Sequence, residues 1–103
     1  MKVIKKLSEH IEEEIGDAEC YAKWALETKE EYPSLADTLY KISLEEMGHM
    51  EALHKEVVKL IEDYRKNEGE PPAGMLAVYD YLHERQIEEA KEAKTYQQMY
   101  KER

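Results

Sequence analysis

The chain has 103 residues and a formal net charge of -9, from 24 acidic and 15 basic side chains. This length suits one domain, and a surface of this sign repels nucleic-acid phosphates and anionic lipids, so we expect neither as a partner. Cys20 is the single cysteine, which excludes an intrachain disulfide framework. Without a transmembrane-length apolar run or a signal-peptide core, we expect a cytoplasmic protein, free or inside a protein compartment.

Apolar residues recur at alternating spacings of three and four, the pattern of amphipathic helices that face a bundle core. Pro33 fits the first turn of a helix, and residues 67–72 combine Asn, Gly and two prolines, which predicts a turn. Short connections predict antiparallel neighbours. We therefore predict an all-α fold in which residues 1–103 form a single domain. Its three long helices are predicted over residues 3–31, 34–66 and 72–101.

Four polar residues stand where these stripes call for apolar ones. Glu14 interrupts the stripe of the first helix, Glu46 and His49 that of the second, and Glu89 that of the third. A carboxylate in a core is costly unless it is paired or bound to a cation. All four positions are roughly mid-helix, so they could converge in one layer around a divalent cation.

Glu46-Met47-Gly48-His49 is the sharpest motif of the chain. Residues three apart share a helix face, so the carboxylate and the imidazole can reach the same ion, and we expect this pair to point inward. The alternative is a buried histidine paired with a glutamate of a neighbouring helix, without metal. The remaining histidines fall beside the stripes and are expected at the surface or at an interface: His10, His54 and His83.

Tyr21 lies two turns after Glu14 on the same stripe. Its hydroxyl could approach the metal site from a neighbouring layer, or Tyr21 could be a core aromatic whose hydroxyl bonds to the backbone. The third helix repeats this arrangement, because Glu89 and Tyr96 have the same spacing as Glu14 and Tyr21. Glu89 is then the counterpart of Glu14.

Glu14 with Tyr21, followed by Glu46-x-x-His49 on the next helix, resembles the first half of a ferritin-like di-iron carboxylate protein. The similarity is greatest to the rubrerythrin, bacterioferritin and encapsulated-ferritin side of that superfamily. In such bundles two helices each supply one Glu and two others each supply a Glu-x-x-His pair. The sequence to Arg103 has no fourth helix and no second pair, so the resemblance implies a bundle and a metal site completed by oligomerisation.

The resemblance also implies a function, which is iron binding and oxidation of Fe(II) with oxygen or peroxide in a homodimer or higher homo-oligomer. Glu46 would bridge two iron ions, and Glu14 and His49 would be terminal ligands. Glu89 would be a further ligand or, where two chains share the site, a residue behind the ligands or on the entry path of the metal. Tyr21 is the candidate catalytic residue, holding carboxylates in place by hydrogen bonds as Tyr96 also could. Manganese or zinc is possible instead of iron. One alternative is a non-catalytic metal-binding module, and another is a metal-free bundle with a buried polar network.

Overall fold

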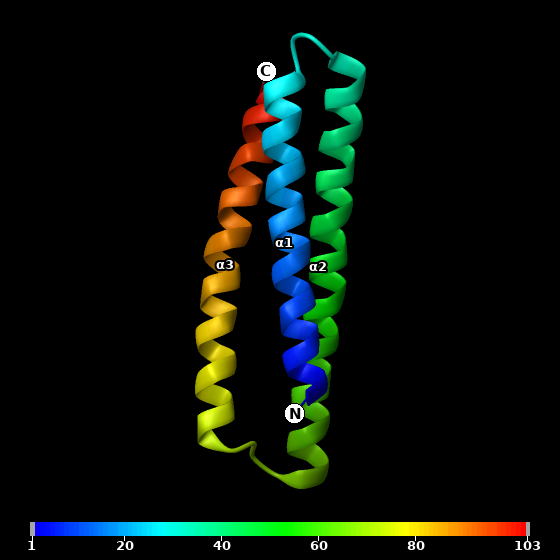
Figure 1. The fold of residues 1–103 in the computed structure, drawn as a ribbon. Coiled ribbons are helices and arrows are strands. Elements are labelled where there is room, and N and C mark those ends of the chain that lie inside the picture. Colours follow the sequence, from blue (N-terminus) through cyan, green and yellow to red (C-terminus); the bar gives the residue numbers. More distant parts are fainter. Residues whose placement is uncertain (1, 103) are drawn as a thin grey trace.

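The computed structural model describes residues 2–102, which form three long α-helices and no strand (Figure 1). These helices are α1 (Lys2–Thr28), α2 (Pro33–Glu68) and α3 (Ala73–Glu102). Successive helices run antiparallel, as Figure 1 shows by the colour gradient along each ribbon. The predicted all-α class and the three helices are confirmed. Within the described part of the chain, no helix is both long and apolar enough to cross a membrane.

The helix boundaries follow local chemistry. α1 ends at Thr28 rather than at residue 31, and the Thr28 hydroxyl donates to the Trp24 carbonyl at 2.9 Å. Pro33 opens α2 and disfavours a helical conformation at the residue before it, so the connection of residues 29–32 separates the two helices. α2 ends before Gly69, whose φ of 90° lies in the region that glycine adopts without strain.

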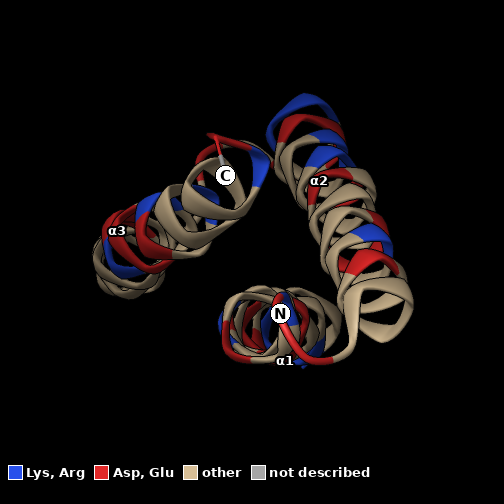
Figure 2. Cartoon of the chain, turned by 90° about the horizontal axis from the view of Figure 1, so that it is seen from above, with Lys and Arg blue, Asp and Glu red and all other residues tan. Residues whose placement is uncertain are grey.

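α1 is the helix around which the others are arranged. It packs against both α2 and α3, whereas α2 and α3 share few contacts with each other. Figure 2 shows the three helices at the corners of a triangle, with acidic and basic stretches on all of them. Alanines let the helices approach closely, because a buried methyl group occupies little space. The fully buried alanines are Ala18, Ala22 and Ala25 of α1, Ala36 of α2 and Ala93 of α3.

Two groups of buried hydrogen bonds join the helices. The Ser43 hydroxyl of α2 donates to the Ala18 carbonyl of α1 at 2.5 Å and accepts from Gln97 Nε2 of α3 at 2.9 Å. Gln86 Nε2 donates to the hydroxyl of Ser8 at 2.9 Å, which ties α3 to the start of α1. Such satisfied polar groups specify one alignment of the helices along their axes.

We expect Ser43→Ala to destabilise the fold by about 1–3 kcal/mol, because it leaves the buried Gln97 amide without its acceptor. Urea unfolding followed by circular dichroism measures this change. Thr38→Ala is the matched control, since the Thr38 hydroxyl is exposed and bonds only to the Ser34 carbonyl one turn earlier. Equal stability of the two variants would show that the Ser43 contact adds nothing.

Candidate metal centre

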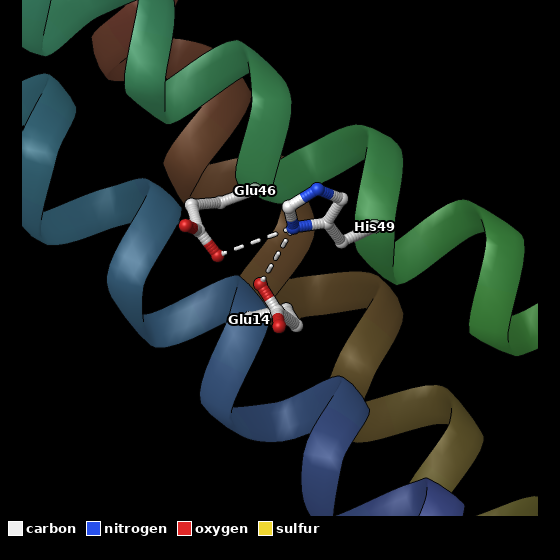
Figure 3. A group of neighbouring side chains, drawn as sticks. All are labelled: Glu14, Glu46 and His49. Carbon is white, nitrogen blue, oxygen red and sulfur yellow. Dashed lines mark ion pairs between the residues drawn. The ribbon is translucent and has the colours of Figure 1, made fainter.

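Glu14, Glu46 and His49 come together where the middle of α1 faces the middle of α2 (Figure 3). One ligand atom of each residue lies within 4.8 Å of the others. His49 Nδ1 is 3.5 Å from Glu14 Oε2 and 3.8 Å from Glu46 Oε2. The three-residue spacing aligns Glu46 with His49, and the packing of α1 on α2 adds Glu14. We call these residues the three-ligand group.

The three-ligand group lies at the margin of the core. The side chains of Glu14 and Glu46 are 22% and 20% exposed, whereas that of His49 is 62% exposed. Figure 3 shows α3 passing behind α1 and α2, on the side away from these side chains. The prediction that His49 points inward is therefore corrected. The stripe of α2 that contains His49 is wider than the part of it that α1 covers. Because α3 packs on another side of α1, it does not cover the rest.

The carboxylates of the group are poorly compensated. Glu14 Oε2 is buried and has no hydrogen-bond partner among residues 2–102. The pKa of Glu46 is raised by the neighbouring Glu14 carboxyl group and by partial burial, while His49 acts in the opposite direction. Two carboxylates held close together are a favourable environment for a cation, which can neutralise both.

The donor set of the three-ligand group also fits a metal. Two carboxylates and one imidazole are ligands that iron, manganese and zinc all accept. Across the described residues, this is the one cluster of three or more potential Cys, His, Asp or Glu ligands that lies within reach of a single ion. The chain therefore supplies three protein ligands from two helices, and further coordination positions would be open.

The structure does not bring Glu89 to this group. Glu89 lies on α3 and its carboxylate is 3.5 Å from the guanidinium of Arg85. Tyr21 packs, partly buried, against a core cluster that includes Ala25 and Leu39, and makes no hydrogen bond to either carboxylate in the part of the chain described. The Tyr96 ring is 5.1 Å from the Lys23 ammonium, between α3 and α1.

The structure also contains a pair of stacked histidines, His54 and His83, to which the sequence analysis assigned no role. The imidazoles of His54 and His83 stack at 4.7 Å with an interplanar angle of 12°, and Tyr79 stacks on His83 at 5.7 Å. This places both histidines, half-buried, at the boundary of α2 and α3. Each of them directly follows a leucine of its stripe, Leu53 or Leu82, and that spacing is the signal that could have paired them.

The stacked histidines predict a pH dependence of stability. Burial, and to a lesser extent the neighbouring His83, lower the pKa of His54, so the folded chain favours the neutral imidazole. The stabilising contribution is complete above the unfolded pKa of about 6.5 and is lost as the pH falls through the lower folded value. We expect His54→Gln to reduce the loss of stability between pH 7.5 and 5.5, measured by urea unfolding. His10→Gln, at an exposed position, should leave that loss unchanged.

No family model, curated protein or solved structure matches this chain. What it does must therefore be inferred from the donor set and from the surfaces around it. The three-ligand group is the feature with the clearest chemistry. The buried Oε2 atom of Glu14 and the raised pKa of Glu46 both indicate carboxylates that a bound cation would stabilise.

Proposed function

We propose that this chain is a ferritin-like di-iron carboxylate protein that binds iron and oxidises Fe(II) with oxygen or peroxide. The observation that carries the proposal is the convergence of Glu14, Glu46 and His49, whose ligand atoms lie within 4.8 Å of one another. The donor set and the uncompensated carboxylates support a divalent cation at this point. The resemblance of the motif to ferritin-like proteins supports iron in particular.

A second copy of the chain would complete the site. Three donors are too few for two ions, and the exposed His49 faces away from α3 (Figure 3). Leu7, Ile42 and Leu53 are only half-buried and lie one or two helical turns from the group, which supports an apolar contact around it. Two copies related by a two-fold axis would bring four carboxylates and two imidazoles together, the donor set of a di-iron site.

In this arrangement the side chains have distinct roles. Glu46 would lie between the two metal positions, and Glu14 and His49 would each hold one ion. The proximity of Glu14 and partial burial raise the pKa of Glu46, and a bound Fe(II) ion would offset the repulsion between the two carboxylates. As substrate, each Fe(II) gives up one electron. Four Fe(II) ions thereby reduce one O2, which takes up four protons and leaves as two water molecules.

Replacement of His49 tests the proposal. We expect His49→Ala to lower the iron bound per chain and to reduce Fe(II)-dependent oxygen uptake at least tenfold, while the helical content remains. Glu45→Ala is the control, because Glu45 is an exposed neighbour of the group and does not belong to it. A wild-type chain that binds no iron, or that consumes oxygen no faster than free Fe(II), would overturn the proposal.

A non-catalytic metal-binding module is the second candidate, because one chain offers three ligands and these suffice to hold one ion. Manganese or zinc would then stabilise a helical oligomer without turnover. Sedimentation of His49→Ala separates the candidates. The module predicts that the metal-dependent assembly is lost, whereas the oxidase predicts an intact fold with lost iron oxidation.

A further inference from the structure

An apolar groove runs between α2 and α3, and α1 forms the floor of its wider part. Its wider part, about 420 Å³, is lined by side chains from all three helices. The apolar lining consists of Ile11 and Ile15 of α1, Met50 of α2, and Ile87 and Ala90 of α3. The side chain of Ile87 is 42% exposed and Met50 is half-buried, whereas Ile11, Ile15 and Ala90 form the buried base of the groove. We call this feature the α2–α3 groove.

The α2–α3 groove continues along the same pair of helices. Beyond the stacked rings of His54 and His83, a second part is lined by Val58, Ile61 and Leu76. Tyr79 lines this second part and stacks on His83, which lines the first part, so the two parts adjoin. From Met50 to Arg65 of α2, the lining spans roughly 22 Å at 1.5 Å per residue. That length and the apolar floor match one stripe of an amphipathic helix of about four turns.

The wider part of the groove has a basic rim. Lys55 of α2 and Lys94 of α3 stand on opposite walls, and neither has an ion pair within residues 2–102. Lys91 also lines this part, and its ammonium is 3.3 Å from Glu88 on the same helix. Glu51 is the acidic residue of this lining. In a chain with a net charge of -9, this local excess of lysine is a distinct feature.

The narrower part has the opposite charge. Glu62 of α2 and Asp80 of α3 line it, and neither is in an ion pair with any described residue. Arg65 is the basic residue there, and its guanidinium is 3.4 Å from Glu70 in the loop after α2. The groove is therefore basic at its wider end and acidic at its narrower end.

We propose that the α2–α3 groove binds an amphipathic helix of a partner protein, with acidic side chains beside Lys55 and Lys94 and basic side chains beside Glu62 and Asp80. The negative C-terminal end of a helix dipole favours the lysine end, so the bound helix runs parallel to α3. This function is separate from iron binding.

Two synthetic peptides test the inference. Both are fluorescein-labelled, have the same apolar stripe and have the same composition. One has basic residues in its N-terminal half and acidic residues in its C-terminal half, and the other has both signs mixed in each half. Fluorescence anisotropy against the purified chain should show about tenfold tighter binding of the first peptide, a difference of about 1.4 kcal/mol.

Charge reversal locates the binding site. Lys94→Glu should weaken binding of the first peptide roughly tenfold and leave the fold intact by circular dichroism. Lys59→Glu, at an exposed lysine of α2 that lines neither part of the groove, is the matched control. Glu46→Gln should leave peptide binding unchanged, which keeps this test independent of iron. Equal affinity for both peptides would overturn the proposal, and so would equal effects of the two lysine variants. Self-association of the chain that Lys94→Glu abolishes would also overturn it, because the groove would then bind a second copy of the chain.

Discussion

Glu46→Gln is expected to abolish iron binding and, at the same time, to stabilise the metal-free chain by up to about 1 kcal/mol at pH 7.5. Glutamine has nearly the shape of glutamate, but it removes one of two carboxylates that face each other across α1 and α2. The pKa of Glu46 is raised because this carboxyl group lies beside that of Glu14 and is partly buried. Loss of that repulsion should raise the midpoint of thermal unfolding without metal.

The pH dependence gives this prediction its sign. A glutamate with a raised folded pKa holds its proton more tightly in the folded state than in the unfolded one. Its penalty is therefore absent well below pH 4.5 and grows as the pH rises through the folded value. The gain from Glu46→Gln should vanish at low pH, and wild-type iron affinity should increase with pH. Glu45→Gln, at the exposed neighbour, should change neither quantity, and a stability gain in that variant would contradict the explanation.

Ile15→Ala is expected to cause the largest loss of stability among single core replacements, about 2–5 kcal/mol. Ile15 is 1% exposed and lies in the core cluster that all three helices share, so its truncation leaves a cavity beside α2 and α3. A midpoint shift in urea unfolding with an unchanged slope would measure this loss.

Ile87→Ala is the matched control for Ile15→Ala, because it removes the same atoms from a side chain that is 42% exposed. It should cost less than about 1.5 kcal/mol. If the two variants lost similar stability, the α2–α3 groove would be closed in solution by another chain, and Ile87 would be buried there. Measurement at several protein concentrations distinguishes this outcome.

Most of the helical architecture could be predicted from the sequence. Pro33 and the segment of residues 67–72 separate the helices, and the regular spacing of apolar residues defines them. The positions of Glu14, Glu46 and His49 within these stripes predicted that they lie close together, because residues of neighbouring stripes meet where antiparallel helices pack. The end of α1 at Thr28 was less predictable, since the Lys and Glu residues that follow it are good helix formers.

Periodicity could not predict which side of α1 each neighbour occupies. The stripe of α3 contains Glu89 in the same phase as Glu14 on α1, yet α3 packs on another side of α1 and pairs Glu89 with Arg85. A stripe shows that residues share a helix face, but it does not show whether a neighbour covers the whole face. For the same reason His49 proved exposed, and the pairing of His54 with His83 could be found only in three dimensions.

The arrangement of the three-ligand group also bears on the order of folding. All three residues belong to α1 and α2, which are joined by the short connection of residues 29–32. Closing so short a loop costs little chain entropy, and contacts between adjacent helices form rapidly. We therefore expect the residues of the three-ligand group to converge as soon as the first two helices pair, before α3 docks. A metal ion present at that stage would bind the nascent hairpin and favour its completion.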